Sequence, residues 1–326
     1  MMKKGIYRIK LVITFFVTIH SSSSMAQTGP SPCEYCPPVS EWGGRIDYHP
    51  SEKVEVKSDI PYAKYGDREI LLDLYLPRNQ TDKKRPIIVM IHGGGWLYGS
   101  KTDLGEAPTQ AVTFAEAGFI VASIDYRLSD EAIFPAAVKD CRAAVQWLKD
   151  NSESYGMDRE NIGVFGISAG GHLALMMGTS PKSTLFESEG SESKTSSQVQ
   201  AVVAIVPNTD FISYYRWKRE TGKEAGLAAK FLGASSLTDL TNAREASPIT
   251  YLDNESAPTF IINTMADDVV DFKQGVLFVE KCRDMGVQAR LFTYSDAPHP
   301  FAAWNRWYDE TMEMAISYFQ EMLIMD

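Results

Sequence analysis

The sequence predicts an α/β fold in which a mostly parallel central sheet is covered by helices on both faces. From about residue 54, short and nearly continuous apolar runs recur along the chain, which is typical of strands buried on both faces of a parallel sheet. Between these runs, apolar residues fall three or four positions apart, as they do on the buried face of a helix. The alternation of the two patterns predicts a parallel sheet between two layers of helices.

Each apolar run predicts one strand. The predicted strands span residues 87–91, 119–124, 162–165, 201–206, 259–263 and 289–294. Helical spacing is clearest in two sets of residues, namely Phe134, Val138, Cys141, Val145 and Leu148, and Phe272, Val276, Val279 and Cys282. Both cysteines in these sets lie on apolar helix faces, where we expect buried thiols.

Two stretches interrupt the alternation. A polar segment that begins at Ser180 predicts a loop, and residues 208–245 include a helix-like stretch in which we expect a small inserted helical cap. The chain has 326 residues, 44% of them hydrophobic and 23% charged, with no internal repeat. We therefore expect a single domain over residues 51–326.

The N-terminus has the three parts of a secretory signal peptide. Four Lys or Arg residues form a basic start, residues 11–19 are apolar, and small residues follow at Ser24 and Ala26. We predict a signal peptide over residues 1–26 with cleavage after Ala26, then a linker over residues 27–50, and a secreted or periplasmic protein. The apolar stretch is too short to span a bilayer and no later run reaches the required ~20 residues, so we expect no membrane anchor.

The net charge argues against nucleic-acid binding. The formal net charge is −10, and removal of residues 1–26 takes away four basic residues and no acidic ones, which gives −14. A nucleic-acid partner would require a basic stripe.

Cys33 and Cys36 stand in a Pro- and Ser-rich part of the predicted linker. A redox-active CxxC motif normally opens a helix, and the prolines here block one. In an oxidising compartment the pair either closes a small disulfide or stays inert.

A single serine stands between two glycines in "GVFGISAGGHLA", residues 163–174. Ser168 follows a predicted strand and precedes a helix-like run, so it lies at the carboxyl end of the sheet, where ligands bind in open α/β folds. Gly166 and Gly170 leave room for a sharp turn that exposes the hydroxyl at the positive end of the helix dipole. The pattern predicts a nucleophile; tight packing of a helix on a strand is the alternative.

A serine nucleophile needs donors for the negative charge that develops on the substrate. The segment "MIHGGGWLYGS", residues 90–100, follows another predicted strand, and its glycines allow backbone N–H groups to face a pocket. We expect an oxyanion hole made by the N–H groups of Gly94, Gly95 and Ala169, each typically worth about 3–4 kcal/mol. A phosphate-binding loop is the alternative, but the GxxxxGK[ST] pattern is absent.

His299 is the candidate base among five histidines. His20 leaves with the signal peptide, and His49 lies beside the linker. We expect His92 to brace the glycine loop and His172 to pack locally, one helical turn beyond the serine. His299 follows the last predicted strand in "SDAPHPF" and completes the chain order Ser, Asp, His.

Two adjacent aspartates, Asp267 and Asp268, follow the predicted strand at 259–263. An acid at this position orients the imidazole of the base and stabilises its cation. Spacing alone does not separate the two, and surface charge is an alternative for both. The sequence has no HExxH motif and no Cys/His cluster, so we expect no metal.

Taken in chain order, "HGGGW", "DYRL", "GISAGGHLA", "ADDVVDFKQG" and "APHPF" resemble the α/β-hydrolase superfamily. More narrowly, roughly residues 54–324 are similar to secreted acetyl esterases and feruloyl-esterase-like enzymes close to the hormone-sensitive-lipase group. Family members often read H-G-T-A-D-P-x-V-P at the acid turn. Aligned with residues 263–271, this pattern implies that Asp267 is the acid; Asn263, Thr264, Asp268 and Asp271 depart from it.

The resemblance implies a serine esterase that needs no cofactor, with Ser168, Asp267 and His299 as its triad and Trp96 as a substrate contact. Further aromatic candidates for a substrate cleft are Tyr214, Tyr215, Trp217 and Trp304. The family resemblance and the predicted export together imply that the enzyme removes acetyl, or secondarily feruloyl, groups from polysaccharides. The expected partner is therefore an acylated saccharide. An amidase, formamidase or peptidase with the same triad, or a non-catalytic binding protein on this fold, is the alternative.

Overall fold

The computed structural model describes residues 36–37, 39–79, 81, 83–102, 106–187, 190, 193–233, 240–299 and 301–324. The predicted signal peptide and Cys33 lie outside the described residues, so the signal peptide, its cleavage and the cysteine pairing stay predictions. Within the described ranges, no helix combines the length and the apolar character needed to cross a bilayer.

A mostly parallel sheet of eight strands runs through the molecule, which confirms the predicted fold class. Its spatial order is β1-β2-β4-β3-β5-β6-β7-β8. The strands are β1 (Val54–Tyr65), β2 (Arg68–Pro77), β3 (Arg85–Ile91), β4 (Ile120–Ile124), β5 (Met157–Ile167), β6 (Ala201–Ile205), β7 (Thr259–Thr264) and β8 (Ala289–Tyr294). The last six are the strands predicted from the apolar runs, and all neighbouring pairs among them are parallel.

The strands β1 and β2 form an antiparallel hairpin that the apolar runs did not predict. Tyr65 pairs with Arg68 across a two-residue turn, and β2 continues the sheet by pairing antiparallel with β4. Much of β1 is exposed because it lies at the edge of the sheet. A half-exposed strand mixes polar and apolar residues and therefore lacks a continuous apolar run.

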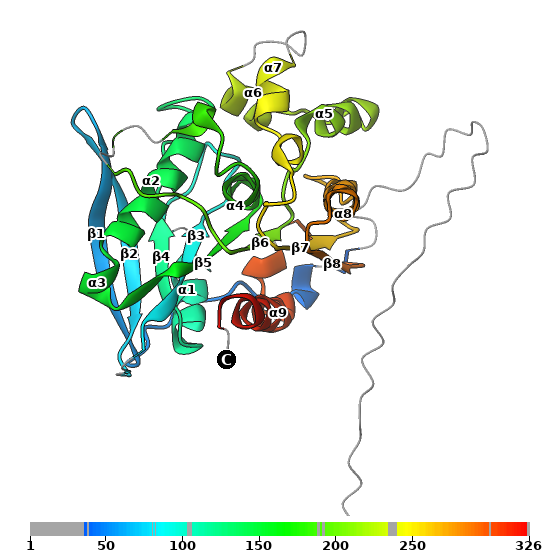
Figure 1. Cartoon of the computed structure of the whole chain (residues 1–326). Coiled ribbons are helices and arrows are strands. Elements are labelled where there is room, and N and C mark those ends of the chain that lie inside the picture. The colour runs from blue at the N-terminus through cyan, green and yellow to red at the C-terminus, as the bar shows by residue number, and fades with distance from the viewer. Residues whose placement is uncertain are drawn as a thin grey trace, which may run out of the picture. The chain divides into compact units, whose positions relative to one another are not determined.

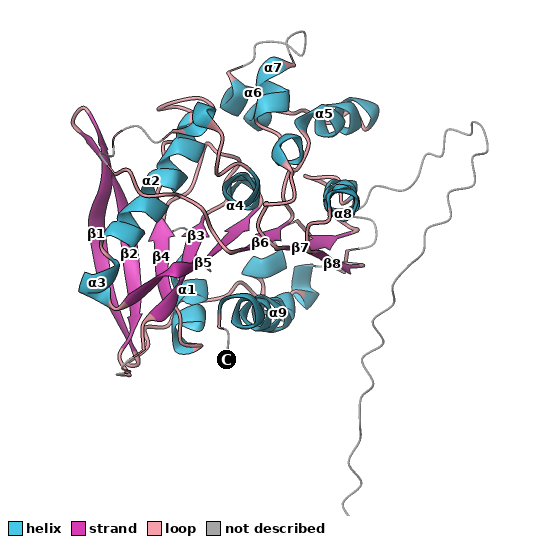
Figure 2. Ribbon diagram, viewed as in Figure 1, coloured by secondary structure: helices cyan, strands magenta, loops and turns pink. Residues whose placement is uncertain are grey.

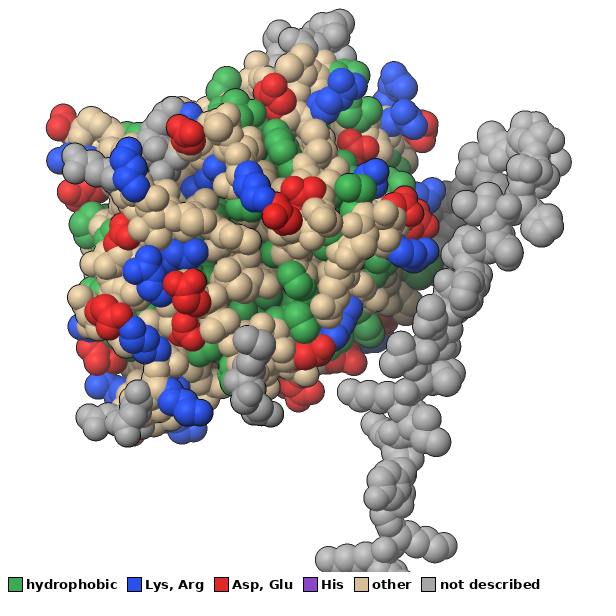
Figure 3. All heavy atoms as spheres, in the orientation of Figure 1, with side chains coloured by type: hydrophobic (Ala, Val, Ile, Leu, Met, Phe, Trp, Pro, Cys, Tyr) green, Lys and Arg blue, Asp and Glu red, His purple; other side chains and the backbone are tan. Residues whose placement is uncertain are grey.

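Helices cover both faces of the sheet, as Figures 1 and 2 show. The helices α2 (Ala136–Asp150), α4 (Ala169–Thr179) and α8 (Lys273–Met285) pack on one face, and α1 (Glu106–Glu116) and α9 (Asn305–Leu323) on the other. A short helix, α3 (Ser152–Tyr155), leads into β5. On the face of the molecule seen in Figure 3, basic and acidic side chains are interspersed.

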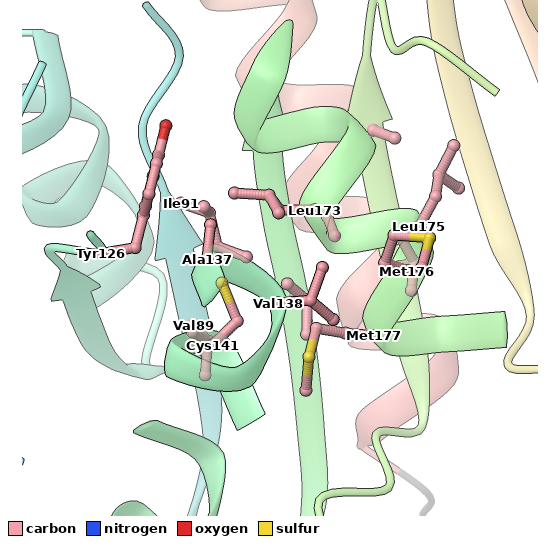
Figure 4. Packing of buried hydrophobic residues seen from close by; sticks show 14 of the residues in the cluster. Val89, Ile91, Tyr126, Ala137, Val138, Cys141, Leu173, Leu175, Met176 and Met177 are labelled. Atoms are coloured by element: carbon pink, nitrogen blue, oxygen red, sulfur yellow. The ribbon is translucent and has the colours of Figure 1, made fainter. Parts of the chain in front are cut away.

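The layer between the sheet and α2 and α4 is the core nearest to Ser168, and Figure 4 shows its packing. Every residue of α4 is buried, so this helix is held from all sides. The predicted apolar face of α2 is buried as expected, and the thiols of Cys141 and Cys282 are buried too. This packing gives the serine at the start of α4 a rigid support.

The buried face of α8 includes the predicted Cys282 but otherwise differs from the predicted one. Gly275 and Phe278 are buried, whereas Val276 and Val279 are only half-buried. A Cβ atom on Gly275 would lie 2.4 Å from the amide nitrogen of Asn263 on β7. This close approach of helix and strand turns the glycine inward, which rotates the valines away from the sheet.

Three helices lie between β6 and β7 in the chain, in the stretch where the cap insertion was expected. They are α5 (Phe211–Glu220), α6 (Gly226–Leu232) and α7 (Thr241–Glu245), and Figure 1 shows them grouped beyond the end of the sheet. The polar segment from Ser180 is mainly loop with one 3₁₀ turn, Thr184–Phe186, whose Phe186 side chain is buried.

Candidate active site

Ser168 lies in a strained turn between β5 and α4. Its backbone has φ +56° and ψ −116°, a left-handed conformation that costs a non-glycine residue about 1–3 kcal/mol. The Ser168 N–H donates to the carbonyl of Ile205 on β6 over 2.8 Å, and the N–H of His172 donates to the Ser168 carbonyl over 2.9 Å. These bonds hold the strained residue between strand and helix.

The two glycines that flank Ser168 are required by sterics. A Cβ atom on Gly166 would lie 2.2 Å from the carbonyl oxygen of Gly170, and one on Gly170 would lie 2.0 Å from that of Ile91. Real Cβ atoms do not approach backbone that closely. The spacing G-x-S-x-G therefore reflects close contact among β3, β5 and α4 at this turn.

The structure brings Ser168, His299 and Asp267 into one hydrogen-bonded row. His299 Nε2 lies 2.9 Å from Ser168 Oγ, and His299 Nδ1 lies 2.7 Å from Asp267 Oδ2. A carboxylate can only accept, so the hydrogen-bond network assigns the proton to Nδ1 and leaves Nε2 to accept from the serine hydroxyl. The carboxylate is buried, whereas Ser168 and His299 are half-buried and reach the surface.

The structure separates the two adjacent aspartates. Asp267 Oδ1 accepts the N–H groups of Val269 and Val270, each over 2.8 Å, while Oδ2 accepts from His299. Asp268 is half-buried and its backbone carbonyl accepts from Lys223 Nζ over 2.7 Å. Asp267 alone faces the histidine, and both of its oxygens are held in place.

Two polar residues at the end of β7 support this acid turn, and in the sequence they stand out only as departures from the family pattern. Thr264 Oγ1 donates to the carbonyl of Ala297 over 2.6 Å and accepts the N–H of Ala266 over 3.2 Å. Asn263 Nδ2 donates to the carbonyl of Phe272 over 2.8 Å. Thr264 thereby ties the Asp267 turn to the loop that carries His299; polar residues ending an apolar strand were the available signal.

The glycine loop after β3 lies against Ser168. A Cβ atom on Gly93 would be 3.7 Å from Ser168 Cβ, and Gly94 and Gly95 have φ values of +95° and +61°. Ala169 is the first residue of α4, so its N–H has no partner within the helix. Within the described part of the chain, none of the hydrogen bonds uses the N–H groups of Gly94, Gly95 or Ala169.

An ionic cluster around the buried Lys101 anchors the far end of this loop. Lys101 Nζ lies 2.8 Å from Asp59 Oδ1 and 3.0 Å from Asp73 Oδ1, and the Lys101 N–H donates to Asp125 Oδ1 over 2.7 Å. At its near end, the His92 ring stacks on Tyr126 with a centroid distance of 4.3 Å. His92 thus braces the loop, as expected.

The structure corrects the expected substrate contact of Trp96. Its side chain is only 5% exposed, and its indole Nε1 donates to Nδ1 of His172 over 3.1 Å. The ring stacks on Phe231 of α6 at 4.7 Å and packs against Phe211 of α5 at 5.5 Å. The cap and α4 occupy the faces of the indole, so Trp96 joins the glycine loop to the cap.

The remaining aromatic candidates divide between cap and surface packing. Tyr214 and Tyr215 are each 6% exposed on α5, whereas Trp217 is half-buried. Trp304 packs edge-on against Trp42 at 4.9 Å. None of these contacts involves the triad side chains directly.

Ligand sites away from the triad are of two possible kinds, a metal site and a cavity. Over the described residues, no group of three or more His, Cys, Asp or Glu side chains is arranged to hold a metal. A cavity of about 390 Å³ lies where β3 and β5 begin, lined in part by Arg85 and Gly156. Parallel strands place this cavity at the end of the sheet opposite to the triad.

Comparison with known proteins agrees with this geometry. The BD-FAE family model matches residues 72–282. The esterase LipC of Mycobacterium tuberculosis is 30% identical over 225 residues, which cover 67% of this chain and 54% of LipC. The chain spans about half the length of such curated relatives.

Two solved structures share the fold. A truncated carbohydrate esterase from gut microbiota has a TM-score of 0.71 at 25% identity, covering 83% of this chain and 99% of its own. A bifunctional GH43-CE protein of Bacteroides eggerthii has a TM-score of 0.71 at 26% identity, covering 82% of this chain and 38% of its own. Since the family match extends over more than half of the sequence, the chain belongs to the BD-FAE family, among the α/β-hydrolases related to hormone-sensitive lipase.

Proposed function

We propose that this protein is a serine carboxylic-ester hydrolase that works through an acyl-enzyme. The observation that carries the proposal is the hydrogen-bonded row Ser168–His299–Asp267, with distances of 2.9 and 2.7 Å. A serine hydroxyl is a weak nucleophile unless a base takes its proton, and here the base is itself oriented by a buried carboxylate. The esterases among the relatives support the same chemistry.

In the proposed reaction, Ser168 Oγ attacks the ester carbonyl carbon while His299 Nε2 takes the hydroxyl proton. The carbonyl oxygen becomes an oxyanion, and the N–H groups of Gly94, Gly95 and Ala169 donate to it. Collapse of this intermediate breaks the ester C–O bond, and His299 returns the proton to the leaving alcohol. Water then attacks the acyl-serine, again through His299, which releases the carboxylic acid and restores the serine.

The proposed substrate is an acylated polysaccharide, from which the enzyme removes acetyl groups or, secondarily, feruloyl groups. The family match and the carbohydrate esterases among the structural neighbours support this choice. The predicted signal peptide supports it as well, because an exported hydrolase meets its substrate outside the cytoplasm. We propose that residues 1–26 are removed and that the protein is secreted or periplasmic.

Hydrolysis of a p-nitrophenyl ester series, from acetate to long acyl chains, tests the reaction with residues 27–326. We expect activity that favours acetate, is lost in Ser168→Ala, and is unchanged in Ser58→Ala, a matched change on the exposed edge strand β1. Absence of turnover in the unmodified protein would remove the esterase proposal and favour the amidase or binding-protein alternatives. If the enzyme hydrolyses neither acetylated xylan nor feruloylated arabinoxylan, the proposed substrate class is removed.

A further inference from the structure

The cap helix α5 is fastened beside the acid turn at both of its ends. At its start, Gln274 Oε1 accepts the N–H groups of Thr209 and Asp210 over 2.8 and 2.9 Å, and Gln274 Nε2 donates to Ser213 Oγ over 2.8 Å. Just past its end, Lys223 Nζ donates to the Asp268 carbonyl over 2.7 Å. Asp268 adjoins Asp267, so side chains on the inner face of α5 lie close to the triad acid.

Lys218 lies on this helix and is 7% exposed. Its ammonium nitrogen is 5.3 Å from the ring centroid of Tyr214 and 5.1 Å from that of Trp217. Among the residues that the structure describes, none forms a hydrogen bond or ion pair with this ammonium. Aromatic faces attract a cation, but they satisfy none of its three N–H donors.

The other buried lysines in the described ranges all have oxygen partners. Lys101 contacts the carboxylates of Asp59 and Asp73, and Lys149 donates to the Gln198 carbonyl over 2.7 Å. Burying a charged group without such partners is costly, and proteins normally avoid it. Lys218 is the exception, because no oxygen of the described residues pairs with its ammonium.

The electrostatic surroundings of Lys218 agree with its place beside the triad. Burial lowers the pKa of Lys218, and the nearby Lys223 lowers it further, while the carboxylates of Asp267 and Asp268 raise it. The oxygens of Asp267 accept hydrogen bonds from His299 and from two backbone N–H groups, so this carboxylate is already satisfied. The ammonium of Lys218 is therefore free to bond to an additional anion.

We infer that Lys218 binds a carboxylate of the substrate, so that the acylated saccharide is an acidic one that carries a uronic acid. The inference rests on the proposed esterase function and adds the substrate's charge to it. A carboxylate accepts two or more hydrogen bonds from an ammonium, and such charge-assisted bonds are stronger than neutral ones. The apolar rings of Tyr214 and Trp217 lie beside the ammonium and lower the local dielectric constant, which strengthens the pairing.

The test uses two acetyl esters that differ only in charge. These are a monoacetylated methyl glucuronoside and its uncharged carboxamide, assayed with Lys218→Met, Lys218→Arg and the control Lys230→Met. Lys230 lies on α6 of the same cap, with an exposed side chain paired to Asp130. Lys218→Met keeps an unbranched apolar stem, and a thermal melt of each variant checks that it folds.

We expect the unmodified enzyme to prefer the acid, and Lys218→Met to lower kcat/KM for the acid about 10- to 100-fold, mainly through KM. The carboxamide should change little, Lys218→Arg should retain the preference, and Lys230→Met should behave as the unmodified enzyme. Added salt should weaken the preference for the acid.

Three results would overturn the inference. One is an unchanged ratio of acid to carboxamide in Lys218→Met, and another is an equal fall for both substrates. The third is hydrolysis of p-nitrophenyl acetate without turnover of either sugar. Failure of the esterase proposal looks different, because p-nitrophenyl acetate itself would then stay intact.

Discussion

The indole nitrogen of Trp96 donates a hydrogen bond to Nδ1 of His172 across 3.1 Å. This bond joins the glycine loop to α4, the helix that starts at the proposed nucleophile. On its other side, His172 Nε2–H donates to the carbonyl of Ala246, between cap helix α7 and β7, over 2.7 Å. Loop, helix and cap thus meet at one buried histidine.

Trp96→Phe tests whether Trp96 packs or binds substrate. The change keeps a ring but removes the only donor to His172 Nδ1 seen in the described structure, which leaves a buried acceptor unsatisfied. We expect the free energy of unfolding to fall by about 1–3 kcal/mol, with KM for p-nitrophenyl acetate nearly unchanged. Urea unfolding and steady-state kinetics measure the two effects. A raised KM at unchanged stability would restore the predicted substrate contact.

Gly170→Ala tests the steric origin of the serine turn. The new Cβ atom would lie 2.0 Å from the Ile91 carbonyl oxygen, and neither backbone segment can move without displacing the sheet. We expect the free energy of unfolding to fall by more than about 3 kcal/mol.

Gly222→Ala is the control for this change. Gly222 has φ +67° but open space around its Cβ position, so we expect a loss of only about 1–2 kcal/mol. Urea titrations of both variants give the comparison. Equal stability of the two would mean that the close approach at Gly170 does not matter.

Asp267→Asn and Asp268→Asn form a matched pair on neighbouring residues. An amide at 267 donates toward His299 Nδ1, which moves the imidazole proton to Nε2, where it blocks proton transfer from Ser168. We expect kcat to fall by about 10⁴-fold, the loss seen for the equivalent change in a serine protease triad. Asp268→Asn should leave kcat almost unchanged because its carboxylate does not contact His299. A larger effect at 268 would reverse the assignment of the acid.

His172 makes stability depend on pH. Burial lowers its pKa to about 4, although its hydrogen bond to the Ala246 carbonyl acts in the opposite direction. In the unfolded chain a histidine titrates near 6.5, so between about pH 6.5 and 4 the unfolded state binds the extra proton. The contribution is complete above about pH 6.5 and is lost as pH falls, by about 2 kcal/mol at pH 5.

Urea unfolding at pH 7.5 and at pH 5 measures this contribution. On acidification, His172→Gln should lose about 2 kcal/mol less than the unmodified protein, because glutamine does not titrate. An equal loss in both proteins would show that His172 does not carry this pH dependence.

The strands predicted most directly from the sequence are those buried along their whole length. The inner strands β4, β6 and β7 are of this kind, so each is a continuous apolar run, whereas β5 is apolar only in its second half and the edge strand β8 is half-buried. The hairpin β1–β2 lies at the edge and is partly exposed, so its pattern is mixed. The face of α8 was predicted only in part: Cys282 is buried as expected, but Val276 and Val279 are half-buried because the approach of Gly275 to Asn263 depends on a different element of the chain.

By itself the sequence determined the fold class and the kinds of residue at the site, namely a serine nucleophile, a histidine base and an aspartate that orients the base. The glycine spacing around Ser168 is visible in the sequence as a tight turn, although the close contacts that require it come from β3 and β6. Only the tertiary structure decided which of Asp267 and Asp268 faces His299, because adjacent side chains diverge and their directions depend on a distant loop. It also decided that Trp96 packs beneath the cap and that Lys218 is buried without an oxygen partner in the described structure. Burial and pairing arise between segments far apart in the chain, so no local pattern records them.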